Sequence, residues 1–137
     1  MSAQLPASLS AAGLQVAGGV GQLGAIVLDC AEPRALAEFW APVLGTEIAS
    51  ADDRWIDLAA ANGGPRVSFQ RVARYRPPSR FRPQQLHLDV AVADLDRAES
   101  LVLGLGAQVR GDIHPASGFP WRVYADPAGH PFCLCAC

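Results

Sequence analysis

The sequence predicts an α+β protein built from two βαβββ modules, and three observations support this. A strand followed by a helix occurs twice, Ala25 of the first copy aligns with His87 of the second, and Trp55 and Trp121 open corresponding later strands. The 137-residue length suits one domain with internal duplication. Because neither module could bury its sheet alone, we expect them to pack as a curved eight-stranded mixed sheet with the helices outside.

The clearer copy of the strand and helix lies in the second half. Apolar and polar side chains alternate from residue 86 to 93, which is typical of a strand. Asp94 is placed as a helix N-cap, apolar residues then recur at helical spacing, and Gly106 suits a left-handed position after the helix. On the strand, His87 and Asp89 share the face that the helix does not cover. These two ionisable groups are the first candidates for a functional site.

The first copy follows the same plan. A buried strand at 24–30 precedes Pro33, which is well suited to the first position of a helix. Apolar residues recur at i, i+3 and i+4 spacing until Gly45, where the helix should end, and Pro42 should bend or tighten its last turns. The strands expected next are at 46–49, 54–60 and 66–72.

Arginine and proline dominate residues 73–84, which are predicted to be a linker between module one (23–72) and module two (85–137). The simplest interpretation is an extended, solvated connection. The alternative is an anion-binding strip, formed by Arg71, Arg74, Arg76, Arg80 and Arg82. The strands expected in the rest of module two are at 108–110, 121–125 and 131–135, with the tight turn Asp126-Pro127-Ala128-Gly129 before the last.

The composition limits the classes of partner. Half of the residues are apolar and the formal net charge is −2, which predicts neither nucleic acid nor an anionic membrane as partner. The first basic residue is Arg34, and no apolar run approaches the ~20 residues of a membrane helix. We therefore expect a cytoplasmic protein with reduced cysteines, no disulfide framework, and residues 1–22 as a flexible tail or an added edge strand.

Three segments resemble the vicinal oxygen chelate superfamily, especially its glyoxalase-like and bleomycin-resistance-like members. They are, in order, LDCAEPRALAEFWAPVLG, LHLDVAVADLDRAESLVLGLGA and WRVYADPAGHPFCLC, and the resemblance covers residues 23–136. It implies the glyoxalase/bleomycin-resistance fold, in which the sheets form a cup that holds a small molecule. It also implies a divalent ion at the floor of the cup in metal-dependent members, and often a homodimer.

The resemblance also implies where a metal would bind. The family ligands are usually a His on the first strand and a Glu on the last strand of each module. By the motifs, these positions fall on Ala25, His87, Cys133 and either Ser68 or Gln70. A divalent ion needs three or four ligands of matched hardness, and only His87 keeps the family residue. We therefore favour no metal and no other cofactor, with His87 as a ligand if a metal does bind.

Strand alternation predicts a polar cup floor. If the protein is catalytic, His87 would be the general base or acid, and Asp89 would orient it or stabilise charge. Ser68 or Gln70 would then donate a hydrogen bond to a substrate oxygen. The residues expected to contact a ligand are Ser68, Gln70, Trp55, Trp121, Cys133 and Cys135. His114 and His130 are expected to have no role beyond the rim of the cup.

Each of these residues also has a purely structural interpretation. His87 could be a hydrogen-bonded histidine inherited from a metal-binding ancestor, and Trp55 and Trp121 could be core. Cys133 and Cys135 could pack as small apolar side chains. The alternative for the thiols is a soft-metal or redox cluster of Cys133, Cys135 and Cys137 with His87 as a nitrogen ligand.

Three functional hypotheses follow. The favoured one is a metal-independent small-molecule-binding protein that sequesters its ligand, as in resistance, or catalyses an isomerase or lyase reaction. The second is a divalent-metal-dependent lyase, isomerase, dioxygenase or thiol transferase. The third is a non-catalytic dimerising or regulatory module whose cup is closed by side chains. The sequence leaves enzymatic activity and ligand identity open, because this fold supports many chemistries.

Overall fold

The computed structural model describes residues 19–61, 63–79, 81–82, 84–115 and 118–136. Of the predicted tail or added edge strand at 1–22, residues 1–18 lie outside the described part of the chain. No helix in the described part has the length and apolar character needed to cross a membrane.

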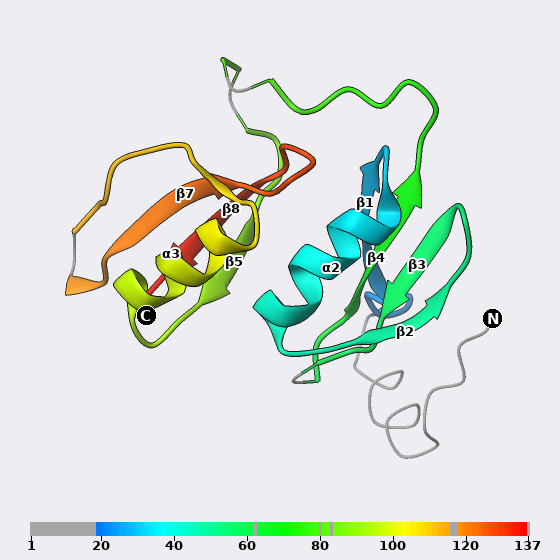
Figure 1. Ribbon diagram of the computed structural model, residues 1–137. Helices are drawn as coiled ribbons and strands as arrows, with labels where there is room; N and C mark the ends of the chain where they lie inside the picture. Colours follow the sequence, from blue (N-terminus) through cyan, green and yellow to red (C-terminus); the bar gives the residue numbers. More distant parts are fainter. Residues whose placement is uncertain (1–18, 62, 80, 83, 116–117, 137) are drawn as a thin grey trace.

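Each module has the predicted βαβββ order (Figure 1). Module one consists of β1 (Ala25–Cys30), α2 (Pro33–Leu44), β2 (Ile48–Ala51), β3 (Trp55–Leu58) and β4 (Arg66–Arg71). Module two consists of β5 (Leu88–Ala91), α3 (Leu95–Gly104), β6 (Gln108–Val109), β7 (Trp121–Ala125) and β8 (Pro131–Cys135). The segment that links β4 to β5 crosses from one module to the other.

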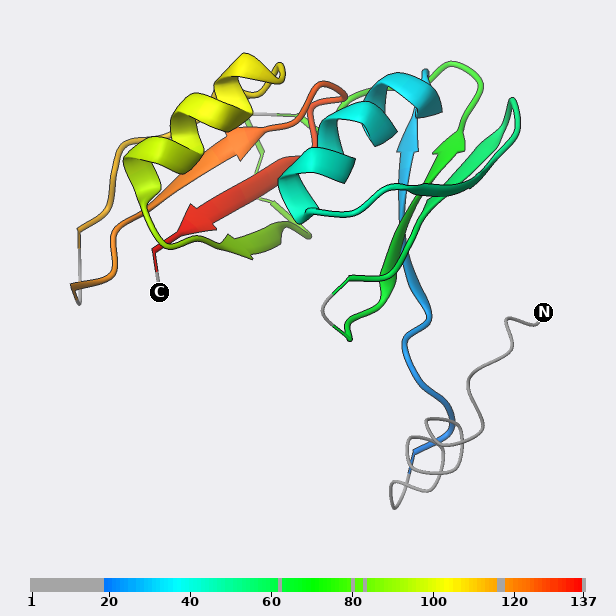
Figure 2. The same cartoon turned by 60° about the horizontal axis from the view of Figure 1, so that its bottom comes forward.

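The eight strands form two four-stranded mixed sheets, one in each module. The orders β1-β4-β3-β2 and β5-β8-β7-β6 are equivalent, and in each the first strand pairs in parallel with the last. The other pairs are antiparallel. Both helices lie on the same side of the sheets (Figure 2). The predicted α+β architecture with outer helices is therefore confirmed, with the eight strands divided between two sheets.

The helix ends show why the sequence folds locally as it does. Gly45 follows α2 with a φ of 67°, and its N–H donates to Pro42 O at 3.3 Å. Asp94 caps α3 by accepting a hydrogen bond from the Arg97 N–H at 3.2 Å. Gly106 follows α3 with a φ of 115°, a conformation that side chains with a Cβ rarely adopt. These caps confirm the predicted ends of both helices.

Some strands are shorter than their sequence pattern predicts. The pattern extends over 54–60, but β3 covers Trp55–Leu58, and the alternation at 86–93 contains only the four residues of β5. The reason is that alternation records which face a side chain occupies, whereas a strand also needs a hydrogen-bonded neighbour. His87 consequently lies just before β5.

Helix α2 packs against both modules and so unites the core. Phe39 and Trp40 on its inner face are buried, and their rings lie 5.8 and 5.1 Å from the ring of Phe132 on β8. The Trp40 Nε1–H donates to Asp126 Oδ2 at 2.8 Å, and Asp126 is 3% exposed. One cluster of buried side chains therefore contains residues of both modules.

The turn between β7 and β8 has the geometry that its sequence predicts. Asp126 Oδ1 accepts hydrogen bonds from the N–H groups of Ala128 and His130, both at 2.9 Å. Gly129 has a φ of 90°, and a Cβ built on it would come within 2.8 Å of Pro77 Cβ. The linker therefore lies directly against this turn, and only glycine leaves room for it.

Candidate functional site

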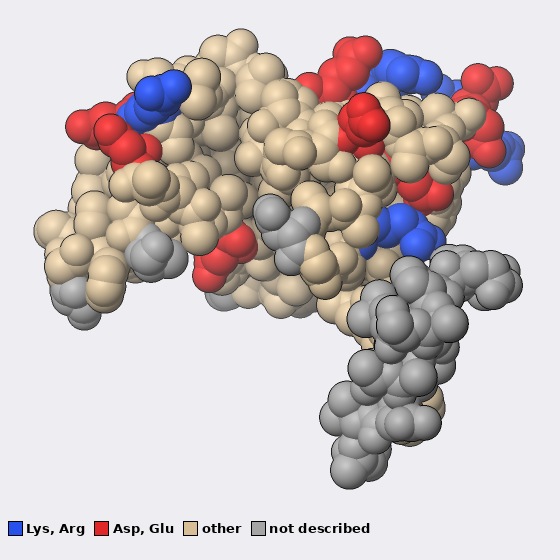
Figure 3. Space-filling view, turned by 90° about the horizontal axis from the view of Figure 1, so that it is seen from below, with Lys and Arg blue, Asp and Glu red and all other residues tan. Residues whose placement is uncertain are grey.

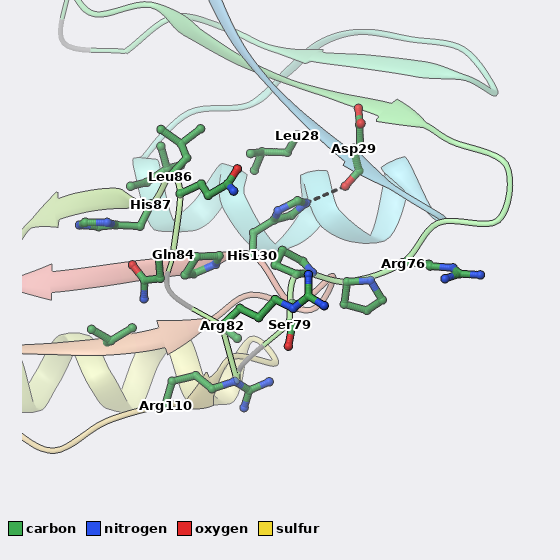
Figure 4. A pocket seen from close by; sticks show the side chains of 18 of the residues that line it. Leu28, Asp29, Arg76, Ser79, Arg82, Gln84, Leu86, His87, Arg110 and His130 are labelled. Atoms are coloured by element: carbon green, nitrogen blue, oxygen red, sulfur yellow. Dashed lines mark hydrogen bonds between the residues drawn. The ribbon is translucent and has the colours of Figure 1, made fainter.

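A cavity of about 1040 Å³ lies where β1, the linker and module two meet (Figure 4). Asp29 contributes from β1, Arg82 and Gln84 from the linker, and His87 and His130 from module two. This volume is sufficient for a drug-sized organic molecule. The cavity is thus formed by both modules together with the segment that joins them.

A second cavity of about 410 Å³ adjoins the first and shares Gln84, His87 and Val123 with it. Its lining consists of Gln84, His87, Asp89, Trp121, Val123, Cys133 and Cys135. Five of the eight site residues predicted from the sequence are therefore brought together here, four of them on module-two strands and His87 just before β5.

Strand register explains this grouping. Asp89 on β5 lies beside Cys133 on β8, and Cys133 in turn lies beside Val123 on β7. Trp121 lies beside Cys135 in the same way. Because side chains alternate along a strand, all of these project from one face of the sheet. The ring of His114 stacks on Trp121 with centroids 4.0 Å apart, but His114 lines neither cavity.

His87 and Asp89 contact each other at the junction of the two cavities. His87 Nε2 lies 3.1 Å from Asp89 Oδ1, and the side chains are 45% and 69% exposed. A neutral His87 that carries its proton on Nε2, the nitrogen facing Asp89, leaves Nδ1 unprotonated. The pair thus has the contact expected of a base and the carboxylate that orients it.

Cys30 on β1 is a free thiol. Cys133 is 5% exposed and its Sγ donates to Leu134 O at 3.6 Å. Burial, together with the nearby Asp126 carboxylate, raises the pKa of Cys30 to about 11, so this thiol stays neutral at pH 7. Cys137, the third member of the predicted thiol cluster, lies outside the described residues.

The predicted site residues of module one surround a different group, the carboxylate of Asp57. Its Oδ1 accepts from Trp55 Nε1 at 2.7 Å, from Ser68 Oγ at 2.5 Å and from Arg66 Nε at 3.4 Å, and its Oδ2 accepts from Ser50 Oγ at 3.0 Å. Trp55 and Ser68 line neither cavity, and the same holds for Gln70, which pairs with Trp55 across the strands. Asp57 itself was not among the site residues predicted from the sequence.

Asp57 is partly buried, with its side chain 23% exposed. Burial alone would raise its pKa, but the hydrogen bonds from Ser68, Trp55 and Ser50 and the charge of Arg66 outweigh burial, and the pKa is lowered. A lowered pKa in the folded state means that this carboxylate stabilises the fold above its unfolded pKa near 3.8. That contribution is lost as the pH falls through the folded-state pKa.

Replacing Asp57 with Asn should therefore lower the free energy of unfolding by about 1–2 kcal/mol at pH 7, because four donors lose a charged acceptor. The difference from the wild type should shrink as the pH falls below about 4. Urea unfolding across this pH range measures it, with the exposed Asp53→Asn as the matched control. A difference that stays constant down to about pH 2 would contradict the assigned role of the charge.

Strand register identifies the first-module counterpart of Cys133. In module two, Cys133 lies beside Asp89, which is two residues after His87. In module one, Ser68 lies beside Val27, which is likewise two residues after Ala25. Ser68, and not Gln70, therefore occupies the fourth of the family's metal positions.

These four positions do not fit a divalent metal. Ala25 offers a methyl group, and the Ser68 hydroxyl is buried and donates to Asp57. Only His87 and Cys133 remain, fewer than the three or four ligands that such an ion requires. In the part of the chain that the structure describes, no three His, Cys, Asp or Glu side chains lie close enough to hold a metal ion.

His130 lines the large cavity and contacts module one. Its Nε2 is 2.6 Å from the carbonyl oxygen of Asp29, so Nε2 carries the proton, since a carbonyl only accepts (Figure 4). The same nitrogen lies 3.2 Å from the hydroxyl of Tyr75, which donates to Ala128 O at 2.7 Å. Burial, with the charge of Asp126, raises the pKa of Tyr75 to about 12. His130 therefore ties β1 to the turn before β8.

The predicted arginine strip is only partly assembled at the cavity. Arg76 and Arg82 line it, whereas Arg74 lines neither cavity. Arg71 lies on the surface, with its Nη2 3.9 Å from Oε1 of Glu32. Arg80 lies outside the described residues. Arg110, which follows β6, also lines the large cavity and was not predicted. On the face shown in Figure 3, charged side chains are scattered among a majority of uncharged ones.

Solved structures show the same fold at low sequence identity. A hypothetical protein, SA1046 from S. aureus, is 18% identical with a TM-score of 0.66, covering 88% of this chain and 96% of that one. A glyoxalase/bleomycin resistance protein/dioxygenase family enzyme from Burkholderia phytofirmans PsJN is 16% identical with a TM-score of 0.67, covering 84% and 98%. The oxidase ChaP-H2 is 22% identical with a TM-score of 0.60, covering 87% and 95%.

A comparison with curated proteins found no match. The sequence pattern of the glyoxalase-like domain, in contrast, matches residues 25–135, which is most of the chain and contains every strand and helix described above. The protein therefore belongs to the glyoxalase-like domain family of the vicinal oxygen chelate superfamily.

Proposed function

We propose that this glyoxalase-like protein binds a small organic molecule in the two adjoining cavities, without the metal of its family. The observation that carries the proposal is the position of His87, which lines both cavities while its Nε2 contacts Asp89. A non-catalytic module with a closed cup would not leave such space around this histidine. Ala25 and Ser68 argue against the metal-dependent alternative, because neither offers a fitting ligand at its family metal position.

The lining is suited to an organic ligand. Trp121, Val123 and Cys133 give the small cavity a largely apolar wall, and Gln84 and His87 add polar groups where the two cavities meet. Predominantly apolar walls with a few fixed polar groups are typical of small-molecule sites. Gln84, which lines both cavities, can donate the hydrogen bond to a ligand oxygen that the sequence assigned to Ser68 or Gln70.

If the bound molecule is turned over, His87 is the general base. Its Nδ1 would remove a proton from a carbon acid, while Asp89 holds the ring and stabilises the imidazolium that forms. This is isomerase or lyase chemistry that requires no metal ligand. If the molecule is only sequestered, the same imidazole acts as a hydrogen-bonding group for it.

Replacing His87 with Ala should weaken binding about tenfold, because one polar contact with the ligand is lost. Binding of single compounds from a fragment library to chelator-treated protein, measured by calorimetry, tests this. His87→Gln is the matched variant: it keeps a hydrogen-bonding side chain but no base, so binding should largely persist while any turnover is lost.

Two results would contradict the proposal. Unchanged affinity of the His87→Ala variant for every fragment would remove His87 from the site. Binding that is lost on chelation and restored by a divalent ion would favour the metal-dependent alternative.

A further inference from the structure

The charge of the large cavity is opposite to that of the whole chain. The chain has 13 acidic residues and 11 arginines, with no lysine. Arg76, Arg82 and Arg110 all line the cavity, but among its described lining residues Asp29 is the only carboxylate. Cationic groups are therefore concentrated at the cavity of a chain that is acidic overall.

These three arginines have no carboxylate partner in the described part of the chain. Ion pairs there involve other arginines, namely Arg66, Arg71 and Arg122. Arg110 donates from its Nη1 to the neutral amide oxygen of Gln108 at 2.9 Å. Figure 4 shows the Asp29 carboxylate directed away from the arginines. Within the described residues, the positive charge at the cavity thus has no ion-pair partner.

We propose that the molecule held in this cavity carries an anionic oxygen group, such as a carboxylate, on an apolar body. The inference rests on the proposed function and defines its ligand class. A guanidinium group presents N–H donors in a planar fork that matches carboxylate, sulfonate and phosphate oxygens. Leu86, Pro77 and Pro78 line the same cavity and provide contacts for an apolar body.

The linker is anchored on both sides of Arg76. The Tyr75 hydroxyl donates to Ala128 O at 2.7 Å, and Pro77 packs against Gly129 so closely that a Cβ would not fit. Anchoring the backbone reduces the conformational entropy that Arg76 loses when it binds an anion. The charge of Arg76 is therefore presented by a positioned segment.

Three probes with the same ring system test the sign of the charge: 1-naphthoate, the neutral 1-naphthamide and the cation 1-naphthylmethylammonium. Calorimetry at low salt should show naphthoate binding about tenfold more tightly than the amide, and the cation no more tightly than the amide. Equal or tighter binding of the amide or the cation overturns the proposal. Inorganic phosphate alone should bind more weakly than naphthoate, and equal binding would overturn the requirement for an apolar body.

Variants that remove one positive charge show which arginines contact the anionic group of the ligand. Arg82→Gln and Arg110→Gln should each weaken naphthoate binding about tenfold and leave the affinity for naphthamide unchanged. Arg34→Gln is the matched control, because it removes the same charge from an exposed position on α2 outside the cavity. The proposal is overturned if the cavity variants bind naphthoate as tightly as Arg34→Gln does. Melting temperatures measured without ligand verify that all three variants fold. Naphthamide binding to the wild type reports separately on the proposed function.

Discussion

Replacing Asp126 with Ala is expected to lower the free energy of unfolding by about 3–4 kcal/mol, because its carboxylate is a buried acceptor for three donors. The carboxylate is 3% exposed and accepts hydrogen bonds from Trp40 Nε1 and from the N–H groups of Ala128 and His130. The variant would leave the indole N–H of Trp40 buried without an acceptor. Urea unfolding at pH 7 measures the change.

A double-mutant cycle separates the contact between the modules from the local turn. Trp40→Phe removes the indole donor but keeps an aromatic ring, so its cost should be about 1–2 kcal/mol smaller when Asp126 is already Ala. Asp126→Asn keeps one carbonyl acceptor and should cost less than Asp126→Ala. Costs of Trp40→Phe and Asp126→Ala that simply add would contradict the proposed link between α2 and the turn.

Replacing Phe132 with Ala is expected to cost about 3–5 kcal/mol, because it opens a cavity where the two modules meet. Phe132 is fully buried, and its ring lies 5.8, 5.1 and 5.5 Å from those of Phe39, Trp40 and Tyr124. The first two rings belong to α2 of module one. The truncation therefore removes contacts between β7 and β8 of module two and contacts between the two modules.

Phe119→Ala is the matched control for this truncation. Phe119 is 54% exposed, so the same change of side chain should alter the free energy of unfolding by about 0.5 kcal/mol or less. Similar costs for the two truncations in thermal or urea unfolding would show that Phe132 is not at the core of the junction.

Much of the architecture could be predicted because local chemistry determines it. Gly45, Asp94 and Gly106 end or begin their helices for backbone reasons that a sequence displays directly. Strand alternation likewise placed His87 and Asp89 on the face where Cys133 and Cys135 also lie. These predictions required only the periodicity of one segment at a time.

The features that could not be predicted from the sequence depend on contacts between distant segments. Asp57 gathers donors from three strands, and such a set becomes visible only when the strand register is known. His130 reaches Asp29 across the junction of the modules, and no local pattern encodes that distance. The composition of the linker indicates an exposed segment, but its path past Gly129 is set by tertiary packing.

The three tryptophans provide the most direct test of the central claim, that a small molecule binds in the adjoining cavities without a metal. Trp40 lines the large cavity and Trp121 the small one, while Trp55 donates to Asp57 and lines neither. The indole N–H resonances of chelator-treated, ¹⁵N-labelled protein should be followed while single fragments are added. Bound fragments should shift the resonances of Trp40 or Trp121 and leave that of Trp55 unchanged. Fragments that shift only Trp55, or a library in which none shifts Trp40 or Trp121, would contradict the claim.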